Sequence, residues 1–177
     1  MTERIYTVGH STHPIDEFVD LLRSHGVTQL VDIRTIPKSR HNPQFGEDQL
    51  SRSLPENGIA YRRLEALGGL RHTTKDSVNG AWKNTSFRGY ADYMQTDAFE
   101  AGLAELLAVG ERKPTVIMCA EAVPWRCHRS LVGDALVVRG VEVLDIMSAK
   151  SAKPHTLTSF ARVDGTQVTY PPTPDPS

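Results

Sequence analysis

Residues 4–34 read RIYTVGHSTHPIDEFVDLLRSHGVTQLVDIR, and this stretch decides the fold. It opens with a short run of strand-favouring residues that ends at Gly9. After Pro14, the segment 15–26 has its apolar residues at helical spacing. A second apolar run at 27–34 predicts another strand. Strand, helix and strand in this order predict a βαβ unit, in which two parallel strands pair through a right-handed crossover.

The same alternation continues along the chain. Further strands are predicted at 59–64, 115–118 and 141–146, and helices at 47–57, 87–94, 99–109 and 130–139. About five strands alternating with helices predict an α/β fold, a single three-layer domain with a mostly parallel sheet.

Residues 1–148 are expected to form this domain, which includes a long polar loop without periodicity at 68–86. We expect residues 149–177 to form a C-terminal extension that is partly disordered. Its end, PPTPDPS at 171–177, cannot be ordered by itself.

The composition is that of a globular protein. The chain has 177 residues, of which 39% are hydrophobic and 23% are charged. No apolar run approaches the length of about 18 residues that a membrane-spanning helix needs. The N-terminus lacks a secretory signal, so we expect a cytoplasmic protein with no membrane partner. Two cysteines are too few for a disulfide framework and favour a reducing compartment.

The net charge of −1 conceals a basic middle section. Residues 34–90 carry ten basic and five acidic side chains, whereas the flanking sections are acidic. A local excess of positive charge suits an anionic ligand, because the potential at a site depends on nearby charges. The alternative is a solvated basic face without a ligand.

In parallel α/β sheets, ligands bind in the crevice beyond the carboxyl ends of the strands. Polar and reactive residues gather after three of the predicted strands. These are His10 and Ser11 after the first, Asp32 and Arg34 at the end of the second, and Cys119, Glu121, Cys127, His128 and Arg129 in and after the strand at 115–118. We therefore expect the site at this edge of the sheet.

The most informative stretch is CAEAVPWRCHR at 119–129, between a buried strand and a helix. Cys127 lies where that helix begins, and the backbone N–H groups there favour a thiolate. We expect Cys127 to act as a nucleophile, with His128 or His10 as the base and Glu121 as the proton donor. The alternatives are an inert thiol at Cys127, a structural histidine at His10 and, for Cys119, a small buried apolar side chain.

Other patterns in this stretch are excluded or remain open. The spacing from Cys119 to Arg126 is one residue too long for a phosphatase-type loop. Cys119 and Cys127 do not form a CxxC motif, so thioredoxin-like redox chemistry has no support. A zinc site made of both cysteines, His128 and His10 remains possible chemically, although its spacing matches no common structural pattern.

Substrate-binding residues are expected on the same edge and on the loop that follows it. They are Ser11, Asp32, Arg34, Lys38, Ser39, Arg40 and Arg129. Asp32 and Arg34 share one face of their strand, so they either pair with each other or bind substrate through the arginine. Arg129 could equally form a structural ion pair with Asp32.

Five motifs in order resemble the DUF488 family of small bacterial and archaeal proteins. They are TVGHS (7–11), VDIRTIPKS (31–39), GIAYRRLEALGG (58–69), FRGYADYM (87–94) and CAEAVPWRCHR (119–129). The resemblance spans about residues 5–147 and implies a compact α/β domain, with no established activity, substrate or cofactor. The family's signature positions correspond here to Gly9, His10, Ser11, Asp32, Arg34, Pro37, Ser39, Tyr61, Gly68, Gly69, Tyr90, Cys119, Glu121, Cys127, His128 and Arg129.

The sequence therefore predicts an enzyme that acts on an anionic small molecule, a nucleotide or a nucleic-acid end, without a cofactor. A second hypothesis is a non-catalytic module that binds nucleic acid or a phosphorylated ligand. A third is a protein that binds a metal through cysteine and histidine. The oligomeric state is not predicted.

Overall fold

The fold begins with the predicted βαβ unit, formed by β1 (Arg4–Gly9), α1 (Ile15–Ser24) and β2 (Gln29–Asp32). The computed structural model describes residues 3–172. The two strands are parallel, but they do not pair with each other, because β4 (Thr115–Cys119) lies between them. The expected direct pairing was therefore wrong, although the direction of both strands was right.

Within residues 3–172, the main sheet has six strands in the order β3-β2-β4-β1-β5-β6. The remaining strands are β3 (Ala60–Arg63), β5 (Glu142–Ser148) and β6 (Ser151–Pro154). Strands β1 to β5 run parallel, and β6 joins β5 in the antiparallel direction. The predicted α/β domain with a mostly parallel sheet is confirmed, with β6 as an additional edge strand.

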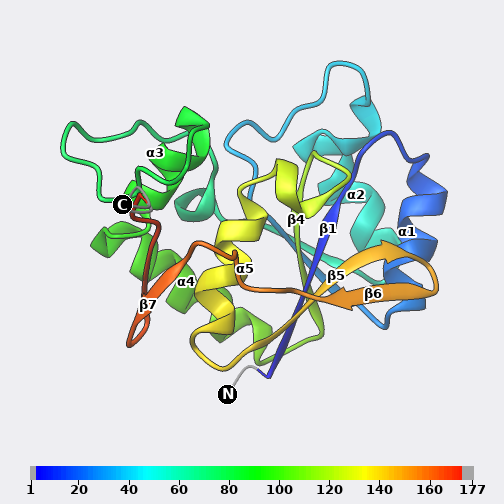
Figure 1. Ribbon diagram of the computed structural model, residues 1–177. Helices are drawn as coiled ribbons and strands as arrows, with labels where there is room; N and C mark the ends of the chain where they lie inside the picture. Colours follow the sequence, from blue (N-terminus) through cyan, green and yellow to red (C-terminus); the bar gives the residue numbers. More distant parts are fainter. Residues whose placement is uncertain (1–2, 173–177) are drawn as a thin grey trace.

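Helices cover both faces of the sheet (Figure 1). Helices α1 and α2 (Glu47–Glu56) pack on one face, and α3 (Thr85–Tyr93), α4 (Asp97–Gly110) and α5 (Arg129–Val137) belong to the core of the other. The central strand β4 shows how the two cores are separated. Its Val116 and Met118 join the core under α1 and α2, whereas Ile117 between them joins the opposite core. Alternate residues of a strand point to opposite faces, so one strand serves both cores.

The long loop predicted at 68–86 is anchored by one carboxylate on α3. The carboxylate of Asp92 accepts hydrogen bonds over 2.6–2.8 Å from four loop residues, Thr73, Thr74, Ser77 and Asn79. Although burial alone raises the pKa of Asp92, these hydrogen bonds bring it below its ordinary value. The loop is therefore fixed at its centre.

The segment after β6 packs back onto the domain. It contains a hairpin of β7 (Arg162–Asp164) and β8 (Gln167–Thr169), followed by Tyr170. Val168 and Tyr170 are buried in the core shared with α3, α4 and α5. The end predicted to be disordered starts at Pro171, and its residues 173–177 lie outside the described part of the chain. Among the described residues, no helix is long and apolar enough to cross a membrane.

Candidate functional site

The carboxyl ends of β1, β2 and β4 meet at one edge, and the chain continues their pairing for one or two residues more. The backbone N–H of His10 donates to Cys119, that of Ser11 donates to Ala120, and that of Ile33 donates to Met118, over 2.9–3.1 Å. Ser11 adopts a left-handed conformation with φ of 49°. These turns bring together the residues that follow each strand.

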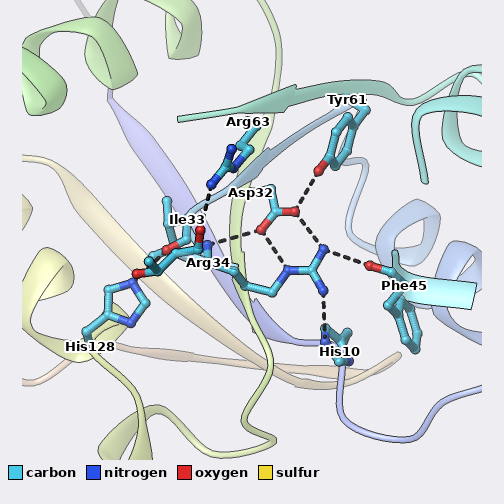
Figure 2. A network of polar contacts seen from close by, with 9 residues as sticks. His10, Asp32, Ile33, Arg34, Phe45, Tyr61, Arg63 and His128 are labelled. Atoms are coloured by element: carbon cyan, nitrogen blue, oxygen red, sulfur yellow. Dashed lines mark hydrogen bonds and ion pairs between the residues drawn. The ribbon is translucent and has the colours of Figure 1, made fainter. Parts of the chain in front are cut away.

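Asp32 and Arg34 form a buried ion pair at this edge, as Figure 2 shows. The Arg34 guanidinium donates from Nε to Oδ1 of Asp32 over 2.9 Å and from Nη2 to Oδ2 over 2.7 Å. Nη2 also donates to the carbonyl of Phe45 over 2.7 Å. The Tyr61 hydroxyl donates to Oδ2 of Asp32 over 2.6 Å. Asp32 therefore holds Arg34 in place and has no oxygen left facing the solvent.

His10 lies behind Arg34 and not beside Cys127. Its ring stacks on Phe45 with centroids 4.3 Å apart, and its Nδ1 donates to the Ser11 carbonyl over 2.8 Å. Nε2 is then the unprotonated nitrogen, 3.4 Å from Nη1 of Arg34. Burial lowers the pKa of His10, so the ring stays neutral and accepts from the arginine (Figure 2).

A cavity of about 360 Å³ opens at this edge. The cavity is lined by residues that follow β2, by residues in and after the end of β4, by the loop before α3 and the first turn of α3, and by the turn before α5. They are Arg34, Thr35, Ile36, Lys38, Gly69, Leu70, Ser86, Phe87, Cys119, Ala120, Glu121, Arg126, Cys127 and His128. Five of the predicted site residues thus share one cavity: Arg34, Lys38, Glu121, Cys127 and His128.

Cys119 and Cys127 form a disulfide that lines the cavity, with Cα atoms 6.9 Å apart. This differs from the expectation of two separate thiols, in which Cys119 was a buried apolar residue. After Cys119 the chain makes a short 3-10 turn, η3 (Pro124–Arg126), which brings Cys127 back over the end of β4. The spacing of eight residues does not show this return path.

The two ring nitrogens of His128 have different partners. One contacts the sulfur of Cys127, and the other contacts the backbone carbonyl of Ile33, directly after β2. Nε2 donates to the carbonyl of Ile33 over 2.8 Å (Figure 2), which leaves Nδ1 unprotonated, 3.5 Å from the Cys127 sulfur. Burial lowers the pKa of His128 to about 4, so the ring is neutral at pH 7. A Cβ atom on Gly69 would lie 2.5 Å from Nδ1, so glycine is needed at that position.

Arg129 lies beneath Cys119 and is only 1% exposed. Its Nη1 donates to the Cys119 sulfur over 3.4 Å and to the carbonyl of Glu121 over 3.0 Å, and Nη2 donates to the carbonyl of Ala122 over 3.3 Å. It does not pair with Asp32, the alternative left open by the sequence. Gly9 leaves room for this arrangement, since a Cβ there would lie 1.4 Å from the Glu121 oxygen and 2.7 Å from Nη1.

Two exposed cations stand at the cavity without an ion pair. Within residues 3–172, neither Lys38 nor Arg126 pairs with a carboxylate, whereas Arg34 is balanced by Asp32. Ile36 and Leu70 are 63% and 65% exposed at the same cavity. The cavity therefore offers positive charge beside apolar surface.

The other predicted site residues lie outside the lining. Asp32 and His10 support Arg34, and Arg129 supports Cys119 from below. Ser39 accepts from the backbone of Asn42 over 3.1 Å, and Ser11 and Arg40 do not line the cavity. Arg126 and Tyr61 were missed as site residues. Arg126 directly precedes Cys127 in the sequence, and this adjacency could have indicated that Arg126 belongs to the site.

The zinc hypothesis finds no support in the geometry. In the part of the chain that the structure describes, no group of three or more histidine, cysteine, aspartate or glutamate side chains could hold a metal ion. The four proposed ligands do not converge, since His10 faces Arg34 and the two sulfurs bond to each other.

Comparison with known proteins agrees with the resemblance drawn from the five motifs. Neither the curated proteins nor the solved structures contain a match. The model of the family described as "Domain of unknown function DUF488" matches residues 14–136, which is more than half of the chain and extends from α1 through most of α5. The chain therefore belongs to the DUF488 family.

Proposed function

We propose that this protein is an enzyme that acts on an anionic substrate through the thiol of Cys127, with the disulfide reduced in the reacting form. The observation that supports the proposal most is that the Cys127 sulfur shares one cavity with the unpaired cations Lys38 and Arg126. A cavity of about 360 Å³ suits a small molecule, a nucleotide or the terminal group of a nucleic acid.

The charges at the cavity favour an anionic substrate that also has an apolar part. Lys38 and Arg126 attract the negative group, and the apolar side chains of Ile36, Leu70 and Phe87 provide contact area. Arg34 is held rigidly by Asp32 and Phe45, so it presents a fixed donor rather than a mobile charge. Fixed donors cost little reorganisation when substrate binds.

In the reacting form, the Cys127 thiolate attacks the electrophilic atom of the substrate, and the leaving group departs with its bonding electrons. Nδ1 of His128 accepts a hydrogen bond from the thiol and orients it. With a pKa of about 4, His128 does not keep the proton at pH 7, so the proton passes to water. The leaving group takes its proton from water at the open cavity, and Glu121, exposed there, is the group proposed to relay it.

The test compares two alkylating reagents on the reduced protein, read separately for each cysteine by peptide mass spectrometry. Iodoacetate is an anion and iodoacetamide is neutral, so the ratio of their rates reports the attraction of anions to the sulfur. We expect a high ratio at Cys127 and a several-fold lower one in a Lys38→Ala, Arg126→Ala double variant. Arg112→Ala, an exposed cation at the opposite end of β4, should leave the ratio unchanged.

Two results would overturn the proposal. The first is that Cys127 reacts with neither reagent until the protein unfolds. The second is that the double variant and Arg112→Ala give the same ratio, because the cations at the cavity would then have no role.

The unpaired cations also favour a second candidate function, binding of a phosphate-bearing ligand or a nucleic-acid end without chemistry. This function does not need the sulfur of Cys127. A Cys127→Ser variant would then bind a 5′-phosphorylated oligonucleotide as tightly as the parent protein, with a steep loss of affinity as salt rises. Salt-independent or absent binding would exclude it.

A further inference from the structure

A buried cation faces the sulfur of Cys119. The Arg129 guanidinium is 1% exposed, and within residues 3–172 it forms no ion pair with a carboxylate. Its partners are the Cys119 sulfur and two backbone carbonyls, and its Nε has no partner. Burying a charge without an opposite charge is costly. Arg129 therefore has no anion in direct contact as long as Cys119 is part of a disulfide, although the carboxylates of Asp145 and Glu121 favour its charged form from farther away.

Reduction of the disulfide supplies that anion. Once the bond to Cys127 is broken, Cys119 can become a thiolate 3.4 Å from Nη1 of Arg129. A thiolate beside an arginine is strongly favoured over one in apolar surroundings. A disulfide whose reduced form is stabilised in this way is a good oxidant, because reduction creates the favourable interaction between the thiolate and the arginine.

The two sulfurs differ in exposure and in their contact with Arg129, and we infer different roles from this difference. Cys127 is 6% exposed, whereas Cys119 is 1% exposed and lies against Arg129. An incoming thiol reaches Cys127 more readily, and the leaving sulfur is then Cys119. Exchange is faster when the leaving thiolate is the more stable one.

We propose that Cys119 and Cys127 form a reversible dithiol–disulfide couple that exchanges with a small anionic thiol, with Cys119 as the leaving thiolate held by Arg129. This rests on the proposed function and names its substrate class. In the direction that reduces the protein, Cys127 is the sulfur that is attacked, and in the reverse direction the Cys127 thiolate attacks a substrate disulfide, as in the proposed function. The substrate thiolate attacks the Cys127 sulfur, a mixed disulfide forms, and Cys119 leaves with the electron pair. A second substrate thiolate attacks the substrate sulfur of the mixed disulfide and expels Cys127. Two substrate thiolates become one disulfide, and the two cysteines take up the two electrons; Cys119 stays a thiolate beside Arg129, and Cys127 takes a proton from water.

The test equilibrates the protein with mixtures of reduced and oxidised glutathione, a small thiol that carries carboxylates. The fractions of dithiol, disulfide and glutathione adduct are measured by mass after acid quenching and alkylation. The parent protein is expected to interconvert between dithiol and disulfide with little adduct. A Cys119→Ser variant should accumulate one adduct on Cys127, since the resolving sulfur is missing. A Cys127→Ser variant should form none, because Cys119 is buried.

The role of Arg129 is tested by Arg129→Met, with Arg129→Lys as the conservative variant. Loss of the cation is expected to shift the equilibrium toward the disulfide by about tenfold or more, because the hydrogen bond from Arg129 is stronger to a charged thiolate than to the neutral disulfide sulfur that it contacts here. Arg129→Lys keeps the positive charge, so its equilibrium between dithiol and disulfide should lie close to that of the parent protein. If Arg129→Met does not fold, as judged by its thermal transition, Arg129→Lys and the two serine variants still provide the test.

The outcomes separate this inference from the proposed function. If the parent protein accumulates the adduct as Cys119→Ser does, Cys119 is no resolving thiol and the inference fails, although Cys127 still reacts with an anionic reagent. If Arg129→Met folds without shifting the equilibrium, the role of Arg129 is refuted. If no adduct forms on Cys127 in Cys119→Ser, the proposed function fails as well.

Discussion

At the scale of single residues, the ion pair of Asp32 and Arg34 is the best-connected feature of the site. The carboxylate of Asp32 is fully buried and accepts from Arg34 and from the Tyr61 hydroxyl. Removing one partner of a buried ion pair leaves a charge without compensation, which costs far more than losing one hydrogen bond. Asp32 therefore contributes to the site mainly because its negative charge offsets the cost of burying the charge of Arg34.

Replacement of Asp32 by asparagine is expected to lower the free energy of unfolding by about 3–5 kcal/mol. Tyr61→Phe removes only one donor to the same carboxylate and is expected to cost about 1–3 kcal/mol. Urea denaturation of both variants measures the difference. Equal losses would show that the charge on Asp32 does not offset the charge on Arg34.

At the scale of elements, the loop between β3 and α3 is fixed by Asp92 and is not a mobile lid. Its amides and hydroxyls that face α3 converge on one carboxylate, while Gly69 and Leu70 at its start line the cavity. Asp92→Ala should speed amide exchange by at least about tenfold at Thr74, whose N–H donates to the carboxylate, and at Asn79, whose N–H donates to the Ser77 hydroxyl that the carboxylate holds. Asp76→Ala, an exposed change in the same loop, serves as the control and should leave exchange unchanged. Similar exchange in both variants would refute the anchor.

Elements could be predicted where one local pattern decides them. Helix α1 follows from the spacing of Phe18, Val19 and Leu22, and all three are buried. Strand pairing depends on distant parts of the chain, so the position of β4 between β1 and β2 carried no local signal. The same holds for the site. The sequence gathered its residues at one edge by the rule for strand ends, but the disulfide and the contact of Arg129 with Cys119 depend on the path of the turn at η3.

At the scale of the whole molecule, His155 fastens the C-terminal segment to the domain. Its Nε2 lies 2.9 Å from Asp134 on α5, and its Nδ1 lies 3.1 Å from Asp145 on β5. The hydroxyl of Tyr170 donates to the same Asp134 over 2.7 Å. Although burial alone lowers the pKa of His155, the hydrogen bonds to Asp134 and Asp145 raise it to about 9. A protonated His155 thus joins the segment that follows β6 to helix α5 through Asp134 and to strand β5 through Asp145.

The stability of the protein should therefore depend on pH in the alkaline range. The pKa of His155 is about 9 in the folded state and about 6.5 in the unfolded chain, so its contribution is complete below pH 6.5. It is lost as the pH rises toward 9, by an amount on the order of 3 kcal/mol. Denaturation of the parent protein and of His155→Gln between pH 6 and 9.5 measures this. A parallel pH dependence in the two proteins would contradict the role of His155.

The order of strands in the sheet has a consequence for synthesis of the chain. A ribosome that has made β1, β2 and β3 has produced the pair of β2 and β3 and the single strand β1, which β4 has still to join. Until Thr115–Cys119 emerges, the facing edges of β1 and β2 are unpaired and open to other strands. Insertion of β4 closes the gap between β1 and β2 and brings Cys119 to the edge in the same event, so the nascent protein gains its central strand and the first sulfur of the disulfide together.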